Sequence, residues 1–273
     1  MPPASHTPAQ RQMIGQFVAF TNSGRTAATQ ALRQSNWNLE QAVNGFYSSN
    51  ASASNNTHKA ALSKLFDKYR DDPKSADTIS MDGMQKYMTD VGVSPEDVSF
   101  LILSELVQSP SMGEMERNGF VTGWSGAGMA LLEQQQTFLQ QTRSNLSKPQ
   151  YRGQLRKIYK HTYTLLRPAS ARTLDLDVAI EMWRVLLSAP SIDWSTPSTP
   201  WLDYYVEFLT TNWKKAVNKD MWDQTFALVE KTLEDESLGW WNELESAWPA
   251  VVDEFITWVL EKRKGGGDAM EVE

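Results

Sequence analysis

The chain has 273 residues, of which 41% are hydrophobic, and a formal net charge of −7 at pH 7. This length allows one sizeable core and a small additional module. Because the sequence contains no cysteine, disulfides, thiolate zinc sites and cysteine-nucleophile chemistry are excluded, and a reducing compartment is expected. The acidic balance argues against general binding of nucleic acids.

The sequence shows neither a signal peptide nor a membrane-spanning segment. The first six residues contain neither a basic nor an apolar region, so no signal peptide is expected. No uninterrupted apolar run approaches the roughly 18 residues that a membrane span needs. We therefore expect a cytoplasmic or nuclear protein without a membrane partner.

A small three-helix module is predicted over residues 7–48. Thr7 and Gln10 have the spacing of a capping box around Pro8 at the first helical position, and Asn38 and Gln41 repeat that spacing before the third helix. Apolar residues recur at helical spacing in each segment. They are Met13, Phe17 and Phe20 in the first, Ala27, Ala28, Ala31 and Leu32 in the second, and Leu39, Ala42, Val43 and Phe46 in the third.

A flexible linker is predicted at residues 49–58, because this stretch is rich in Ser and Asn and lacks large apolar residues. From residue 59 to residue 264 the helical pattern resumes with brief interruptions, and no alternating strand exceeds a few residues. The last nine residues, 265–273, are expected to form a disordered tail. The fold class is therefore all-α, with a second, larger helical domain at residues 59–264.

Residues 71–82 lie between two predicted helices and have the outline of an EF-hand loop. A calcium loop needs oxygen ligands at alternating positions and a final bidentate Glu. Here Pro73 and Ala76 occupy key positions of the loop, and Asp82 stands where Glu is required. The stretch at residues 172–178 is similarly degenerate. A helix-loop-helix unit without metal is the preferred interpretation, and we expect no metal or other cofactor.

Catalytic motifs are missing from the sequence. The three histidines, His6, His58 and His161, are far apart along the chain. We find no phosphate loop, nucleophile elbow or zinc-ligand motif. The carboxylate pairs are no more than an acidic helical protein contains by chance, so no catalytic residue is predicted.

The C-terminal region is acidic and rich in tryptophan. Residues 220–273 contain 14 Asp or Glu against 4 Lys or Arg, and nine of the eleven tryptophans lie between Trp183 and Trp258. Such charge can steer a basic partner, although a solvated helical face with a polar tail is the preferred explanation of the charge alone. A tryptophan side chain usually belongs to the hydrophobic core. Trp248 and Pro249, however, lie beside an acidic helix start, which favours a protein–protein interface for this segment.

Seven short runs, taken in order, cover nearly the whole chain: residues 16–21 (QFVAFT), 36–42 (NWNLEQA), 65–69 (LFDKY), 79–85 (ISMDGMQ), 174–180 (LDLDVAI), 219–222 (KDMW) and 247–255 (AWPAVVDEF). In this combination they resemble the defective-in-cullin-neddylation family. Its members join an N-terminal ubiquitin-associated (UBA) domain to a helical potentiating-neddylation domain. The resemblance implies a UBA-like bundle followed by a domain with degenerate EF-hand-like units.

The resemblance also implies a function without chemistry in this chain. Such proteins are scaffold-type co-ligases that bridge a cullin and the conjugating enzyme of the cullin-specific ubiquitin-like modifier, beside the cullin RING subunit. The cullin C-terminal domain would be held by an acidic patch, which corresponds here to Asp220, Ala247 and Asp253. Two carboxylates complement Lys or Arg, and the small Ala permits close approach.

Two more sites follow from the resemblance. A pocket would receive the acetylated N-terminal methionine of the conjugating enzyme, whose burial no longer desolvates a charge. Its matching residues are Met84, Gln85, Met88, Leu101, Leu103, Val107, Met115, Leu165, Met182 and Val185. The UBA-like module would bind ubiquitin or a relative. The residues implied for this contact are Phe20, Thr21, Val43, Phe46 and Tyr47.

Two other functions remain open from the residues alone. One is a calcium-responsive EF-hand-like regulator, which calcium titration would reveal. The other is a plain ubiquitin receptor whose helical domain serves another partner. A cullin-modification assay separates the receptor from the scaffold, because only the scaffold increases the rate.

Overall fold

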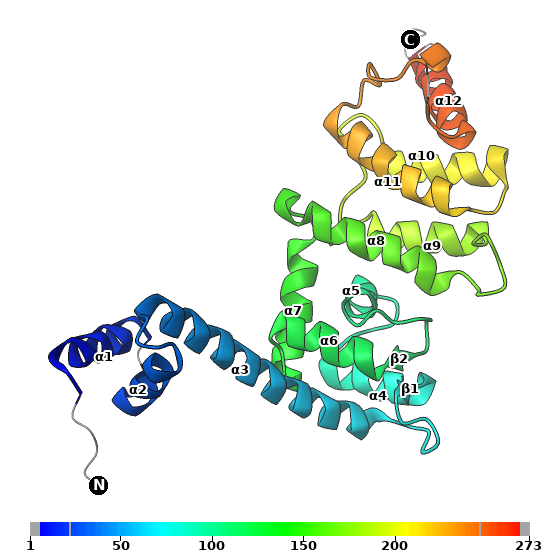
Figure 1. The fold of residues 1–273 in the computed structure, drawn as a ribbon. Coiled ribbons are helices and arrows are strands. Elements are labelled where there is room, and N and C mark those ends of the chain that lie inside the picture. Colours follow the sequence, from blue (N-terminus) through cyan, green and yellow to red (C-terminus); the bar gives the residue numbers. More distant parts are fainter. Residues whose placement is uncertain (1–5, 22, 246, 268–273) are drawn as a thin grey trace. The chain divides into compact units, whose positions relative to one another are not determined.

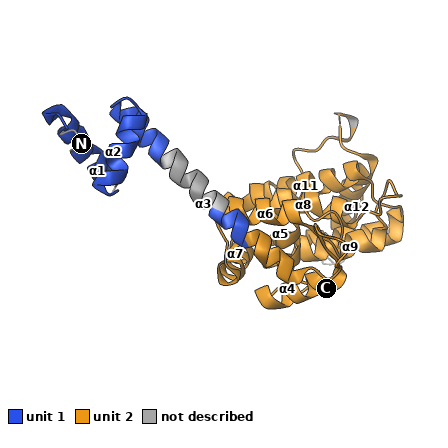
Figure 2. Cartoon of the chain, turned by 60° about the horizontal axis from the view of Figure 1, so that its bottom comes forward, with its two compact units in different colours: residues 1–61 blue, residues 62–273 orange. Residues whose placement is uncertain are grey.

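The protein is described by a computed structural model over residues 6–21, 23–245 and 247–267, with the backbone alone for residues 47–56, 244 and 265–267. Helices dominate this described part, and its strands are limited to the two-residue β1 (Thr78–Ile79) and β2 (Met115–Glu116). The predicted all-α class is therefore confirmed. The chain divides into two compact units, residues 1–61 and 62–273, which Figure 2 colours separately.

Unit 1 is a three-helix bundle of α1 (Pro8–Thr21), α2 (Arg25–Gln34) and the start of α3 (Leu39–Tyr69). Both predicted caps are present. The Gln10 amide donates to Thr7 Oγ1 at 3.2 Å, the Thr7 amide donates to Gln10 Oε1 at 3.0 Å, and the Gln41 amide donates to Asn38 Oδ1 at 3.0 Å. These local bonds fix the helix starts around a small core. The core consists of Ile14, Phe17, Ala28, Leu32 and Ala42.

The bounds of α3 include residues 49–58, for which the sequence predicts a flexible linker. The two units meet in the chain at residues 61 and 62. The predicted boundaries at 7–48, 49–58 and 59–264 stay predictions. Of the expected tail, residues 265–267 belong to the last helix and residues 268–273 lie outside the described part.

Unit 2 contains the helices that follow α3, together with the short turns of helix between them. They are α4 (Met81–Val91), α5 (Val98–Leu106), α6 (Arg117–Ala127), α7 (Leu132–Asn145), η1 (Pro149–Tyr151), α8 (Arg152–Leu166), α9 (Leu176–Leu186), α10 (Trp201–Phe208), η2 (Leu209–Trp213), α11 (Lys219–Glu234), η3 (Glu243–Glu245) and α12 (Ala250–Gly267). Within this unit α8 and α9 lie between the α4–α7 group and the α10–α12 group (Figure 1). No helix of the described residues is both long and apolar enough to span a bilayer.

An aromatic stack connects α8, α9 and α11 at the centre of unit 2. Trp222 stacks on Tyr159 and on Trp183, with ring centroids 4.6 Å and 5.3 Å apart. Its indole N–H donates to the Tyr159 carbonyl at 2.9 Å, and the Tyr159 hydroxyl donates to the Trp222 carbonyl at 2.7 Å. The Trp183 indole donates to the same hydroxyl at 2.7 Å. Every polar atom that this stack buries therefore has a partner, as a dry core requires.

The loop that resembles an EF-hand is closed by its own side chain. The Asp71 carboxylate accepts hydrogen bonds from the Ser80 amide at 3.0 Å, the Ser80 hydroxyl at 2.6 Å and the Gly83 amide at 3.1 Å. The hydrogen bonds from Ser80 are the main reason that the pKa of Asp71 lies well below its usual range, so this carboxylate stays ionised. Gly83 permits this closure, because a Cβ there would lie 2.0 Å from the Tyr69 carbonyl oxygen.

The loop between α3 and α4 is joined to the loop between α5 and α6 by β1 and β2, which pair antiparallel with Thr78 opposite Glu116 and Ile79 opposite Met115. Arg117, directly after β2, reinforces this junction and lies 4.6 Å above the Phe66 ring. Its guanidinium donates to groups at the end of α3 and in the 71–80 loop. The acceptors are Asp67 (2.7 Å), Asp77 (2.7 Å), the Ser63 hydroxyl (2.9 Å) and the Ser63 and Ala76 carbonyls.

We expect Arg117→Lys to destabilise unit 2 by roughly 2 kcal/mol, because an ammonium cannot serve acceptors on three sides as a planar guanidinium does. Urea unfolding followed by circular dichroism measures this loss. Lys68→Ala is the control, since the Lys68–Asp90 pair is 59% and 41% exposed and such pairs contribute less than about 1 kcal/mol. Equal stability of Arg117→Lys and wild type would contradict the assigned role.

Candidate functional site

The three residues of the acidic patch lie at the starts of α11 and α12, which pack against each other. Asp220 is exposed in the first turn of α11, where the Asn218 side chain caps the helix by accepting from the Met221 amide at 2.8 Å. Ala247 is exposed just before Trp248 and Pro249, and Asp253 is half-buried in the first turn of α12. A helix N-terminus stabilises an ionised carboxylate, so both acids are suited to meet a cation.

Three half-buried tryptophans, Trp240, Trp241 and Trp248, lie between α11 and α12, and we call them the tryptophan cluster. The Trp241 indole N–H donates to Asp253 Oδ1 at 2.9 Å. The Trp240 indole donates to the Asp235 carbonyl at 3.1 Å, and its ring lies 5.8 Å from that of Trp248. Trp241 is thus the member of the cluster that contacts the carboxylate.

A cavity of about 390 Å³ opens between α5 and α9, and we call it the α5–α9 cavity. Its volume falls within the range of small-ligand pockets. The lining combines an apolar floor with carboxylates. The lining residues are Pro95, Glu96, Asp97, Phe100, Leu101, Met112, Glu181, Met182 and Val185.

The charge of this cavity comes mainly from its rim. Burial disfavours the ionised form of Asp97, but hydrogen bonds from Arg143 and Ser99 outweigh it and lower the pKa of that carboxyl. Its charge is balanced by Arg143, which lies 2.9 Å away. Glu96 and Glu181 are exposed at the rim. The cavity therefore presents an apolar floor below an acidic edge.

Of the ten residues predicted for a methionine pocket, Leu101, Met182 and Val185 line this cavity. The structure places the other seven elsewhere. Gln85 is exposed on α4. The remaining six are at most 5% exposed and belong to the core of unit 2: Met84, Met88, Leu103, Val107, Met115 and Leu165.

In unit 1 the structure brings Phe20 and Val43 together around a hollow of about 390 Å³, which Leu39, Glu40 and Asn44 complete. Phe20 is 65% exposed, so most of its side chain faces solvent. The Thr21 hydroxyl donates to the Phe17 carbonyl at 2.7 Å. Phe46 packs edge-on against Phe17 at 5.4 Å and lines a separate groove beside α2. The side chain of Tyr47 lies outside the described residues.

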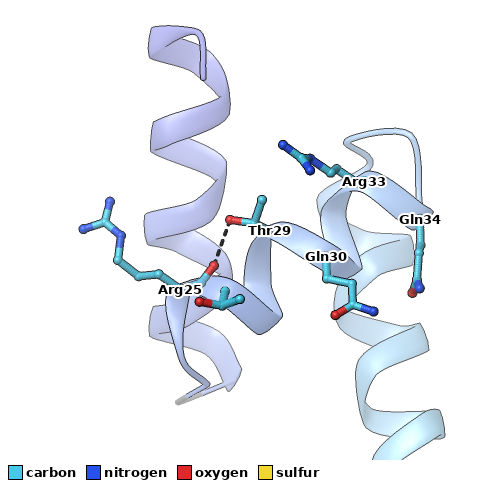
Figure 3. Close-up of a pocket in the computed structure, with 6 residues that line it drawn as sticks. Arg25, Thr29, Gln30, Arg33 and Gln34 are labelled. Carbon is cyan, nitrogen blue, oxygen red and sulfur yellow. Dashed lines mark hydrogen bonds between the residues drawn. The ribbon is translucent and has the colours of Figure 1, made fainter. Parts of the chain in front are cut away.

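A polar hollow of about 560 Å³ lies along α2 and contains none of the residues predicted for ubiquitin. Figure 3 shows that its side chains, which include Arg25, Thr29, Gln30, Arg33 and Gln34, spread along one face of the helix. They do not converge on a common point. We interpret this face as a solvated helix surface.

Comparison with known proteins follows the same division of the chain. A family model described as a UBA-like domain matches residues 11–53, and one described as cullin binding matches residues 134–258. "Defective in cullin neddylation protein 1" of Pyricularia oryzae is 31% identical over 98% of this chain and 99% of its own length. The protein of the same name from Yarrowia lipolytica is 31% identical over 92% of this chain and 97% of its own. "DCN1-like protein 4" of Drosophila melanogaster is 26% identical over 70% and 71%.

The chain belongs to the defective-in-cullin-neddylation family. The resemblance seen in the sequence is thereby confirmed. The region of this family member that matches the cullin-binding model contains Asp220, Ala247 and Asp253, together with the whole tryptophan cluster. The α5–α9 cavity extends beyond that region, because Phe100 and Leu101 precede it and Met182 and Val185 lie inside it.

Several residues of these candidate sites were not predicted from the sequence of this family member. Trp241 lies in the Trp-rich segment, but its bond to Asp253 spans twelve residues without a helical period. Glu96, Met112 and Glu181 join the α5–α9 cavity from three separate segments. One signal was available for Met112, which is a large apolar residue within a turn-rich stretch.

Proposed function

We propose that this protein promotes cullin neddylation as a scaffold, by holding a cullin C-terminal domain and the conjugating enzyme of the cullin-specific modifier together. The observation that carries the proposal is the membership of the family over nearly the whole chain. Rate enhancement would come from proximity, since fixing two reactants converts a bimolecular step into an effectively unimolecular one. A scaffold of this kind needs no nucleophile, and the chain has no cysteine.

The cullin side of the scaffold would be the patch of Asp220, Ala247 and Asp253. Its support is the exposure of Asp220 and Ala247 and the position of both acids in first helical turns. A basic surface of the cullin would complement these carboxylates, and such pairs are shorter and stronger than neutral hydrogen bonds.

The conjugating-enzyme side would be the α5–α9 cavity. The apolar floor of Leu101, Met182 and Val185 suits a methionine side chain. Acetylation removes the terminal charge, so that end can be buried against the floor at a small desolvation cost. The exposed Glu96 and Glu181 at the rim would then favour basic residues further along the bound peptide.

A reconstituted reaction tests the scaffold. The mixture contains a cullin C-terminal domain with its RING subunit and a limiting amount of thioester-charged conjugating enzyme. Adding the protein should raise the initial rate of cullin modification roughly tenfold or more. An unchanged rate, with ubiquitin still bound by the isolated protein, would favour the plain ubiquitin receptor instead.

The cavity yields a separate prediction. Met182→Glu places a carboxylate on the half-buried floor and should weaken binding of an N-acetylated methionine peptide about tenfold or more. Isothermal titration with acetylated and free-amine forms of the peptide measures this effect, and the acetylated form should bind wild type more tightly. Leu131→Glu is the matched control, because Leu131 is 61% exposed and does not line the cavity. If the wild-type protein bound the free-amine peptide more tightly, the peptide terminus would lie at the acidic rim of the cavity and not on its apolar floor.

Ubiquitin binding by unit 1 is a second proposed activity, and the exposed Phe20 beside Val43 favours it. Phe20→Ala should weaken ubiquitin binding and leave the melting temperature of the protein unchanged, since the side chain is mostly in solvent. Nuclear magnetic resonance titration with ubiquitin measures the affinity. If the resonances near Phe20 and Val43 did not shift on adding ubiquitin, the binding site would lie elsewhere on unit 1.

A further inference from the structure

We propose that Trp241 is a positioning residue for Asp253, and that its indole N–H holds this carboxylate in the orientation in which it would meet a basic side chain of the cullin. The proposal rests on the proposed function, because it assigns Asp253 to the cullin contact. It adds a residue outside the acidic patch.

A hydrogen bond joins Trp241 directly to Asp253. The indole N–H of Trp241 donates to Asp253 Oδ1 at 2.9 Å, and both side chains are half-buried. This bond restricts the orientation of the carboxylate, so less side-chain entropy is lost when a cation binds. A neutral donor achieves this without cancelling the negative charge, which a lysine or arginine in the same place would do.

Contacts of neighbouring residues hold the segment around Trp241 in place. The neighbouring Trp240 donates to the Asp235 carbonyl at 3.1 Å at the end of α11, and its ring contacts that of Trp248 at the start of α12. Leu238 takes a positive φ of 64° before this pair and is only 4% exposed, so the turn is anchored in the core. The segment is therefore fixed at both sides of the tryptophan that meets Asp253.

The ring of Trp241 also suits a basic partner. Its half-buried indole is hydrogen-bonded to Asp253 and offers apolar surface to the methylene stem of a lysine or arginine. The exposed acids Asp235, Glu243 and Glu254 of the same C-terminal region add attraction for such a partner.

The experiment is a double-mutant cycle on the full chain, with affinity for a cullin C-terminal domain measured by isothermal titration. Trp241→Phe keeps a ring and removes the N–H, and it should weaken cullin binding about tenfold. Trp37→Phe makes the same change at a half-buried tryptophan of unit 1, outside the tryptophan cluster. That control should change the affinity by less than about threefold. With Asp253→Asn already present, Trp241→Phe should have no further effect, because it acts through the carboxylate.

The outcomes separate the two proposals. If Asp253→Asn binds the cullin as wild type does, the proposed cullin patch fails. If Asp253→Asn weakens binding but Trp241→Phe does not, or if the two effects simply add, the patch stands and the role of Trp241 is refuted. The indole N–H resonance of Trp241 gives a direct readout, since it should shift in Asp253→Asn and again when cullin is added to wild type.

Discussion

Replacing Asp253 by lysine is expected to abolish binding of the cullin C-terminal domain. The change removes one carboxylate of the proposed patch and sets an ammonium against the basic surface of the partner. Reversal of a charge at such a contact costs about 3 kcal/mol or more, which corresponds to a roughly 100-fold or greater rise in Kd. Pull-down and isothermal titration measure the loss, and far-ultraviolet circular dichroism should remain unchanged.

Two companion variants keep this prediction decisive. Asp253 is half-buried and accepts from Trp241, so a lysine there also disturbs the local structure. Asp220→Lys reverses charge at an exposed position and should weaken binding without that disturbance. Glu261→Lys makes the same change in charge at an exposed position two turns along α12 and should leave affinity within about threefold. Wild-type affinity in both Asp220→Lys and Asp253→Lys would place the cullin contact elsewhere.

The largest loss of stability is expected for Trp222→Ala. This side chain is 0% exposed and stacks between Tyr159 and Trp183. Removing it creates a cavity where α8, α9 and α11 meet, and it ends the indole bond to the Tyr159 carbonyl. Truncation of a buried tryptophan costs about 3–5 kcal/mol, so a large share of the stability of unit 2 would be lost.

Urea unfolding with and without the substitution measures this cost through the shift of the midpoint at constant m. Trp213→Ala is the matched control, because Trp213 is half-buried and lies outside the stack, and roughly 1–2 kcal/mol is expected there. Trp222→Phe keeps a ring but removes the donor, so it should fall between these values. A loss below about 1 kcal/mol for Trp222→Ala would show that the stack is not a main support of the unit.

Helices and their caps were predictable because they depend on neighbours in the chain. Thr7 with Gln10 and Asn38 with Gln41 are three residues apart, and each pair makes the bond that its spacing indicates. The apolar stripes depend on the same short period. In contrast, Arg117 donates to Ser63 across 54 residues, and no local pattern marks the acceptors that a guanidinium will reach after folding.

The candidate sites show a second limit. A match to a family fixes the position of a residue along a helix, but neighbouring side chains decide whether that residue meets solvent. Leu101 and Leu103 are two residues apart on α5 and belong to the same core, at 3% and 0% exposed, yet Leu101 lines the α5–α9 cavity and Leu103 is not among its lining residues. The same limit hides Glu96 and Glu181, whose charges become a common rim only when α5 and α9 come together.

Asp71 has a consequence for the conditions under which unit 2 keeps its shape. The anion that joins Ser80 and Gly83 is covalently part of the polypeptide, so it is present at the same effective concentration in every molecule. A chelator cannot withdraw it, and the closure needs no second component. The loop would therefore keep its geometry in every folded copy of the protein, leaving docking to depend on the abundance of the proteins that assemble.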